Sequence, residues 1–443
     1  MIEAQPEDAM TYSTAPADAT SATMLAGAGL DLRVLADGDA DVFAAWIQAV
    51  RRGFLDAHGS ADELETRRAL LAYRRKTGVY DPTVPAPDTP VATLASWIGE
   101  LSVPGGRDLP SCAISSVTVA PTHRRRGIAR ALVEGELRLA ASQGVPAAVL
   151  TVSESVLYGR YGFGPAASVA SLTLDTKAAT WTGPKPAGRV DFITRERLRD
   201  LLPALHDRVR LSWPGELRLP GGHPERVAGI NPAAKDAAAR RAVQYTDATG
   251  AVAGLAVYTA HENHDDFARS TVRIGYLLAE TPDAYAALWR YFVELDLIGT
   301  VEANELSVDE PLLWMISDQR AAQVRIIDHH YLRLLDIPAA LEARSYDAPG
   351  TLALDVTDPI GISAGRWLLQ TDAAGVGHVR PWDGARPSGA VEVRLGVTEL
   401  SAAYLGGVSL ATLAAAGRVQ TSDPAAAARV LAWHVPPRQS FWY

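Results

Sequence analysis

The first third of the chain alternates between strand-like and helix-like spacing of its apolar residues. Strict alternation or a short apolar run predicts a strand, whereas apolar residues three and four positions apart predict a helix. The pattern predicts strands at 30–35, 91–101, 113–119, 147–152 and 164–174, and helices at 42–50, from residue 60 and at 128–142. Asp39 or Asp41 would cap the first helix, and Ser60 with Glu63 has capping-box spacing for the second. This order predicts a mixed α/β domain.

A Pro/Gly-rich segment, Thr182–Gly188, predicts a linker to a second domain. Strand 271–278, a break at 280–283 and a helix over 284–297 repeat the plan of residues 115–139. The break in the first copy carries three arginines and a glycine, whereas the second carries two acidic residues and no glycine. We therefore expect two copies of one fold, of which the second has lost an anion site. Chance recurrence of a common motif is the alternative.

The last part of the chain, from about Leu335, has the pattern of short strands followed by helices. The predicted strands are 352–356, 365–371, 375–380 and 390–395, and the predicted helices are 398–405, 410–415 and 424–432. This order predicts an α+β domain without concentrated catalytic residues. The expected organisation is a flexible extension at 1–28, an α/β domain at 29–183, its second copy at 184–334 and the α+β domain at 335–443.

Composition and charge limit the classes of function. The 443 residues include 42 basic and 51 acidic ones, and the net charge of −9 argues against a general nucleic-acid or membrane-surface binder. The single cysteine, Cys112, excludes an internal disulfide and a cysteine zinc site, and a small buried thiol is expected. No apolar run reaches the roughly 20 residues that span a bilayer, and the N-terminus lacks signal-peptide features. We expect a cytoplasmic protein, with Met24 as an alternative start.

Segment 116–129 carries the strongest chemical signal. The apolar strand Val117–Val119 runs into a basic turn, Arg124–Arg126, and Gly127 precedes a helix. Unpaired main-chain N–H groups and the positive end of the helix dipole make this geometry a phosphate site. Gly127 and Ala129 would let the main chain approach the ligand, and the arginines would bind phosphate oxygens. A solvated basic turn that touches nucleic acid is the alternative.

The pattern Arg124-x-x-Gly127-x-Ala129 after this strand resembles the acetyl-CoA signature of GNAT N-acetyltransferases. The resemblance implies that the main chain of Val117–Val119 lies beside the acetyl-pantetheine arm, and that N–H groups from Arg125 to Arg130 hold the pyrophosphate. Acetyl-CoA would be the co-substrate, with no metal. The residues assigned to it are Val117, Thr118, Val119, Arg124, Arg125, Arg126, Gly127, Ile128, Ala129, Arg130, Ser153 and Glu154.

A narrower resemblance lies in Ser153–Gly164, SESVLYGRYGFG, which is similar to a segment of the Eis (enhanced intracellular survival) acetyltransferases. The linker, the second domain, a C-terminal part like a sterol carrier protein and the aromatic last residue also fit, so the resemblance covers about Gly29–Tyr443. It implies tandem GNAT domains followed by a sterol-carrier-protein-like α+β domain, and a homohexamer. It also implies acetylation of primary amines in aminoglycoside-like polyamines, and with it antibiotic resistance.

The same resemblance assigns two catalytic roles. Tyr158 would be the general acid that protonates the departing CoA thiolate, and the α-carboxylate of Tyr443 would accept the proton of the amine. A phenol can donate a proton from a fixed position, and a chain terminus with a pKa near roughly 3.5 is an anion at neutral pH. Without the resemblance Tyr158 would be a core or rim aromatic, and Tyr161 and Phe163 are expected to pack the turn.

Other chemically capable residues lack a supporting pattern. The pair His329–His330 has no partner at metal-ligand spacing, so a structural or exposed role is expected. His123 lies beside the basic turn and receives no role. Trp46, Phe54 and Trp97 could line an amine pocket, and core packing is an equal alternative for each.

Three alternative functions stay open. The acceptor could be protein lysine or a biosynthetic amine. The C-terminal domain could make the chain a non-enzymatic lipid-binding or regulatory protein, which would leave the Arg/Gly turn and Tyr158 unexplained. Nucleic-acid binding through Arg124–Arg126 is the third.

Overall fold

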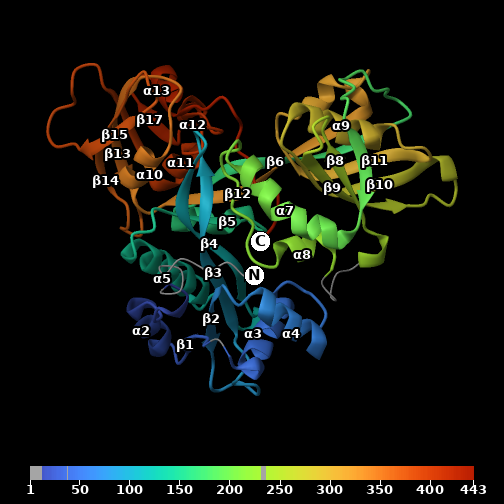
Figure 1. The fold of residues 1–443 in the computed structure, drawn as a ribbon. Coiled ribbons are helices and arrows are strands. Elements are labelled where there is room, and N and C mark those ends of the chain that lie inside the picture. Colours follow the sequence, from blue (N-terminus) through green and yellow to red (C-terminus); the bar gives the residue numbers. More distant parts are fainter. Residues whose placement is uncertain (1–11, 37, 231–235) are drawn as a thin grey trace. The chain divides into compact units, whose positions relative to one another are not determined.

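The computed structural model describes residues 12–36, 38–230 and 236–443 (Figure 1). They form two compact units. The first unit contains the residues up to Ala166, His330–His434 and Tyr443, and the second contains Ala167–His329 and Val435–Trp442. Strands β6 (Gly164–Asp175) and β12 (Ala322–Leu334) each pass from one unit into the other.

The N-terminal part of the first unit is a sheet with the order β1-β2-β3-β4-β5-β12. Its strands are β1 (Asp31–Val34), β2 (Arg75–Tyr80), β3 (Ala92–Val103), β4 (Arg107–Val119), β5 (Ala147–Thr151) and the end of β12. Its helices are α2 (Ala19–Gly27), α3 (Ala40–Gly53), α4 (Ala61–Leu70), α5 (Ile128–Ser142) and α6 (Ser155–Tyr158). Neighbouring strands pair antiparallel except β4 and β5, which are parallel because α5 connects them. The strands and helices predicted for this part are confirmed, and β2, α2 and α6 are additional.

Helices cover both faces of this sheet. Successive residues of a strand point to opposite faces. Leu94 of β3 is buried with residues of α5, and the next residue, Ala95, is buried with residues of α3. Helix α3 begins at the N-cap Asp39, and α4 begins with the predicted capping box of Ser60 and Glu63. The local sequence therefore fixes where α3 and α4 begin, and the alternation of β3 places α3 and α5 on opposite faces of the sheet.

Residues 12–28 pack against the first unit through a few buried side chains and are not a flexible extension. The buried Tyr12 hydroxyl donates to Glu136 Oε1 of α5 at 2.7 Å. Helix α2 packs on α5 through Ser21, whose hydroxyl donates to an α5 carbonyl at 2.7 Å. The expectation of a flexible segment therefore does not hold here, and residues 1–11 lie outside the described residues.

The C-terminal part of the first unit is a second sheet with the order β15-β14-β13-β16-β17. Its strands are β13 (Gly350–Thr357), β14 (Gly365–Thr371), β15 (Gly377–Pro381), β16 (Val391–Gly396) and β17 (Val419–Thr421). Its helices are α10 (Ile337–Ala343), α11 (Val397–Ala403), α12 (Leu410–Ala415) and α13 (Pro424–Leu431). The predicted α+β character is confirmed, and β17 and α10 are additional.

The second unit is built around a sheet with the order β6-β11-β10-β9-β8-β7. Besides β6, its strands are β7 (Arg189–Ile193), β8 (Arg241–Thr246), β9 (Val252–His261), β10 (Ser270–Ala279) and β11 (Ile298–Leu306), and its helices are α7 (Arg195–Arg210), α8 (His223–Ala228) and α9 (Pro282–Val293). Leu255 of β9 is buried with α7, and Ala256 with α9, so helices cover both faces here too. The predicted repeat is confirmed, because β4-α5-β5 and β10-α9-β11 are both parallel strand–helix–strand units.

Candidate functional site

Strands β4 and β5 separate toward their carboxyl ends. Within the described sheet, their parallel pairing reaches as far as Ala113 opposite Val149. Beyond this pair, Ser116 has a left-handed main chain (φ 54°), and the register of β4 with β3 shifts beside it. A bulge of this kind bends the strand and turns its main chain. The main-chain N–H and C=O groups that Val117–Val119 direct toward β5 therefore have no partner in the parallel β4–β5 ladder.

The turn between β4 and α5 has the geometry of an anion site. It contains the short helix η1 (Pro121–His123), three arginines and Gly127, which lies in the left-handed region (φ 78°) and is the N-cap of α5. No side chain from the described ranges caps this helix, and the first N–H groups of a helix have no acceptors within it. The N–H groups of Ile128, Ala129 and Arg130 therefore point out of the helix end, where the dipole favours an anion.

The arginines of this turn differ in their surroundings. Arg124 and Arg125 are exposed. Arg126 donates to Asp81 Oδ2 at 3.4 Å and to the carbonyl of Ala28, the C-cap of α2, at 3.2 Å. His123 Nε2 lies 3.1 Å from the same Asp81 oxygen. Arg124 and Arg125 can turn toward a phosphate, whereas Arg126 and His123 hold the turn in place.

The other residues predicted to contact the co-substrate lie at the same end of the sheet. The Ile128 side chain is buried in the core, and the Arg130 side chain pairs with Glu134 at 2.8 Å, so both would act through their N–H groups. Ser153 and Glu154 are exposed just after β5, and Glu154 is the N-cap of α6 without a capping side-chain bond.

Tyr158 ends α6, immediately before the short helix η2 (Gly159–Tyr161). Its ring packs edge-on against Phe163, with 6.1 Å between the ring centroids. Burial, together with the nearby Tyr161 and Glu154, raises the pKa of Tyr158 to about 12. The hydroxyl is therefore neutral and able to donate a proton at physiological pH. Tyr161 and Phe163 are buried, which confirms that they pack the turn.

Helix α11 of the C-terminal sheet supports the turn that carries Tyr158. Thr398 Oγ1 donates to the carbonyl of Gly159, the residue after Tyr158, at 3.3 Å. Gly164 lies against the main chain of α11, where an added Cβ would collide with the Thr398 carbonyl oxygen and come within 2.7 Å of the Ala402 nitrogen. Gly164 therefore allows the C-terminal sheet to pack directly against this segment.

The last residue, Tyr443, is held where β4 and β5 separate. Ser115 lies on β4 just beyond the residues that pair with β5, and its Oγ donates to the main-chain oxygen of Tyr443 at 2.9 Å. The Tyr443 hydroxyl lies 2.7 Å from Nε2 of His330, and His330 is the register partner of Thr151 at the end of β5. The Trp97 ring contacts the Tyr443 ring edge-on, at 5.2 Å between centroids. Tyr443 is thus anchored beside both separating strands.

Sequence reasoning did not identify Ser115 and His330 as neighbours of Tyr443, and no local pattern marks them. Of the three aromatic residues considered for an amine pocket, Trp97 contacts Tyr443, Trp46 is buried in the core, and Phe54 is exposed. The catalytic roles of Tyr158 and Tyr443 remain predictions.

The second unit repeats the strand geometry without the anion site. Strands β10 and β11 pair in parallel as far as Ile274 opposite Ala303, and the register of β10 with β9 shifts at Gly275. Helix α9 is already capped by the Thr281 side chain, which accepts from a main-chain N–H at 3.1 Å, and its first turn contains Asp283. A capped, acidic helix start does not favour phosphate.

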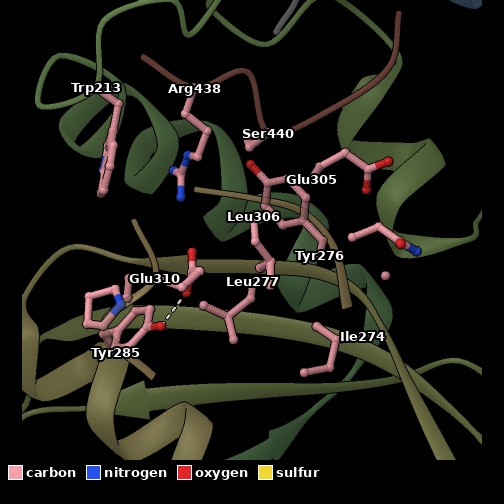
Figure 2. A pocket seen from close by; sticks show the side chains of 14 residues that line it. Trp213, Ile274, Tyr276, Leu277, Tyr285, Glu305, Leu306, Glu310, Arg438 and Ser440 are labelled. Carbon is pink, nitrogen blue, oxygen red and sulfur yellow. Dashed lines mark hydrogen bonds between the residues drawn. The ribbon is translucent and has the colours of Figure 1, made fainter. Parts of the chain in front are cut away.

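A cavity of about 70 Å³ lies where β10 and β11 separate in the second unit (Figure 2). Its apolar wall is formed by Trp213, Ile274, Tyr276, Leu277 and Leu306. Figure 2 shows the Tyr285 hydroxyl donating to Glu310, and burial raises the pKa of this carboxyl. Two tail residues also line the cavity and bind the buried Glu216: Arg438 Nε at 2.9 Å and Ser440 Oγ at 3.0 Å. The second unit therefore binds the chain's own tail at the position of a co-substrate cleft.

A bulged strand, a parallel partner that diverges from it and an uncapped helix that starts at a left-handed glycine define the acyl-CoA site of a GNAT acyltransferase. Family models agree with this class. Residues 36–166 match an acetyltransferase (GNAT) domain, residues 223–334 match a second acetyltransferase (GNAT) domain, and residues 337–441 match a sterol carrier protein domain.

Relatives narrow the class to a family. An uncharacterized N-acetyltransferase of Streptomyces avermitilis is 34% identical over 411 residues, 90% of this chain and 94% of that protein. The N-acetyltransferase Eis of Mycobacterium tuberculosis is 32% identical over 76% of this chain and 81% of its own length. The crystal structure of Eis1 from Mycobacterium abscessus superposes with a TM-score of 0.79 at 27% identity, covering 94% of this chain and 100% of that one. The chain belongs to the Eis family of GNAT N-acetyltransferases.

Family membership makes the chain an N-acetyltransferase enzyme with tandem GNAT domains and a sterol-carrier-like domain, and GNAT acetyltransferases use acetyl-CoA as co-substrate. The part of the chain that the structure describes contains no group of three or more His, Cys, Asp or Glu residues that could hold a metal ion. Among the same residues, no helix combines the length and apolar character that a membrane span needs.

Proposed function

We propose that this enzyme transfers the acetyl group of acetyl-CoA to primary amines of aminoglycoside-like polyamines, at more than one position of the acceptor. Tyr158 acts as the general acid, and the carboxylate of Tyr443 acts as the general base. The observation that carries the proposal is the position of Tyr443, which Ser115 and His330 hold beside the separating strands β4 and β5.

The residues of the first unit fit acetyl-CoA. The N-terminus of α5 offers N–H groups and a positive dipole end to the pyrophosphate, with Arg124 and Arg125 exposed beside it. The main chain of Val117–Val119 can hydrogen-bond the amides of the pantetheine arm, because its β5 side lies outside the sheet ladder. When bound, acetyl-CoA supplies an activated acyl thioester and a thiolate leaving group.

The proton transfers belong to residues of this chain. An amine attacks only as the neutral base, and a terminal carboxylate with a pKa near roughly 3.5 is the anion that accepts its proton, directly or through a water molecule. Ser115 orients this terminus through its hydrogen bond to the Tyr443 main-chain oxygen. Tyr158, kept protonated by a pKa of about 12, donates to the departing sulfur.

The family resemblance supports the aminoglycoside-like acceptor, but one contact favours an acceptor with fewer positive charges. The Arg74 guanidinium lies 4.4 Å from the centre of the Trp97 ring, and Trp97 contacts Tyr443. A fixed positive charge repels a polycation more strongly than a monoamine. A biosynthetic amine or a protein lysine is therefore the second candidate.

The proposal also includes the homohexamer that the resemblance implies, a cytoplasmic location, and no nucleic-acid or membrane partner. Light scattering of the full chain tests the hexamer, and retention on DNA at low salt would contradict the absence of a nucleic-acid partner.

A panel of amines tests the acceptor class. Purified enzyme, acetyl-CoA and each of several aminoglycosides, polyamines, monoamines and lysine peptides are assayed for release of the CoA thiol. The proposal predicts the highest kcat/KM for aminoglycosides and products that carry more than one acetyl group by mass spectrometry. Preference for monoamines or peptides would support the second candidate, and no turnover with any amine would contradict amine acetylation.

Gly127→Ala is expected to weaken acetyl-CoA binding. A residue with a Cβ in the left-handed region costs about 1–2 kcal/mol, and relief of this strain would turn the N–H groups at the start of α5 away from the pyrophosphate. Isothermal titration measures the acetyl-CoA affinity, and thermal unfolding measures the stability.

Gly144→Ala is the matched control at the other end of α5. Gly144 has φ 72°, and an added Cβ would meet nothing within 4 Å, so the strain is similar while the phosphate turn is untouched. Both variants are expected to lose similar stability, but only Gly127→Ala should lose affinity for acetyl-CoA. Equal affinities of the two variants for acetyl-CoA would show that this turn does not bind the co-substrate.

A further inference from the structure

His330, on strand β12, is buried in the first unit, and its side chain contacts the last residue of the chain. Its Nε2 lies 2.7 Å from the Tyr443 hydroxyl, and the two rings meet edge to face with centroids 5.8 Å apart. Burial also raises the pKa of the Tyr443 hydroxyl, so this group stays neutral and needs a polar partner. The hydrogen bond to His330 supplies that partner.

Two further contacts of Tyr443 act on different parts of the residue. Ser115 on β4 binds its main-chain oxygen, and Trp97 on β3 packs against its ring. His330 binds the far end of the side chain from the β5 side of the sheet, where it pairs with Thr151. Contacts to the main chain, the ring and the hydroxyl together select one orientation of the residue, and the carboxylate on the same Cα is oriented with them.

We propose that His330 is a positioning residue for acetyl transfer: its hydrogen bond to the Tyr443 hydroxyl holds the terminal carboxylate in the orientation that accepts the proton of the amine. The inference rests on the proposed role of that carboxylate as the general base. It makes the hydroxyl of the last residue functional as well, because Tyr443→Phe would keep the base and lose this contact.

A double-mutant cycle tests this contact through kinetics. Tyr443→Phe and His330→Phe are each expected to lower kcat about 3- to 10-fold, the effect of one hydrogen bond, with KM for acetyl-CoA unchanged. The double variant should be no slower than the slower single variant, because both substitutions remove the same bond. His330→Gln, which keeps a side-chain N–H donor, should recover part of the loss. Wild-type kcat in Tyr443→Phe, or losses that multiply in the double variant, would overturn the proposal.

His434→Gln is the matched control. His434 is an exposed histidine of the same unit whose ring pairs with Asp347 at 2.9 Å, and it lies outside the proposed site. Its substitution should leave kcat unchanged. Tyr443→Phe keeps the test decisive if His330→Phe does not fold, since it removes only a hydroxyl from the end of the chain.

A second measurement is independent of activity. Carboxypeptidase A removes C-terminal aromatic residues, and its rate on the folded protein reports how often the end of the chain leaves its site. Loss of residue 443, followed by intact mass, should be about 3- to 10-fold faster in Tyr443→Phe and His330→Phe than in the wild type. Equal rates would overturn the proposal.

The two measurements separate this inference from the proposed function. An enzyme with two arginines appended after Tyr443 has no carboxylate on that residue. If this extended enzyme loses activity while release of residue 443 is unchanged in the Tyr443→Phe and His330→Phe variants, only the His330 contact fails. If the extended enzyme remains fully active while release is faster in those variants, the general-base role fails, and with it the catalytic reason for the contact.

Discussion

Tyr158→Phe is expected to lower kcat by roughly 10²- to 10⁴-fold, the usual contribution of a positioned general acid. The substitution removes the proton donor for the departing CoA sulfur and keeps the ring that packs against Phe163. The fold and the phosphate turn are unaffected, so the affinity for acetyl-CoA should not change. Release of the CoA thiol at saturating amine measures kcat, and isothermal titration measures acetyl-CoA binding.

Tyr161→Phe is the control for this experiment. It removes a hydroxyl from the same turn, three residues later, and should retain wild-type kcat.

The pH dependence of kcat gives a second check. With a pKa of about 12, Tyr158 stays protonated as the pH rises through 10, the usual pKa of a tyrosine. Wild-type kcat should therefore not fall near pH 10 through loss of this proton. Undiminished activity in Tyr158→Phe would remove Tyr158 from the mechanism.

The phosphate turn could be predicted because its determinants are contiguous. A strand, a glycine in the left-handed region and the periodic apolar positions of α5 all lie within 117–142, and the helix spans the predicted residues. Local backbone preferences specify such a unit without help from distant contacts. The capping box of α4 and the N-cap of α3 are local in the same sense.

Strand β2 could not be predicted, because distant residues make it stable. It begins with Arg75 and Lys76, which local rules place at the surface. In the fold both are buried. Arg75 pairs with the distant Glu136 at 3.3 Å, whereas Lys76 donates to the nearby Arg74 carbonyl at 2.7 Å. Glu136 also binds Tyr12, so the same long-range network explains why the N-terminal segment is ordered.

The residues around Tyr443 could not be predicted from the sequence either, because only the fold brings them together. Ser115, Trp97 and His330 come from three strands and carry no shared motif, and only the resemblance to the Eis family drew attention to the last residue. Histidine pairs without metal-ligand spacing are commonly structural, and burial of His329 and His330 agrees with that expectation. The role proposed for His330 follows from its contact with Tyr443, and only the fold brings these two residues together.

Two arginines appended after Tyr443 are expected to lower kcat by roughly 10²-fold or more, comparable to the loss of a general base. The appended residues convert the Tyr443 carboxylate into a neutral amide, which cannot accept a proton from the amine. The Ser115 hydroxyl could still donate to the remaining carbonyl oxygen, so the fold of the first unit should persist. Activity is measured by release of the CoA thiol, and thermal unfolding confirms that the extended protein is folded.

Carboxypeptidase B supplies the control within the same sample, because it removes C-terminal arginines and stops at the tyrosine. Treatment should restore the Tyr443 carboxylate and with it the wild-type kcat, which shows that the extension acted on the terminus and not on folding. Acetyl-CoA binding should be the same before and after treatment, since the phosphate turn lies on another segment of the unit. Full activity of the extended enzyme would contradict the general-base role and leave the amine to lose its proton to solvent.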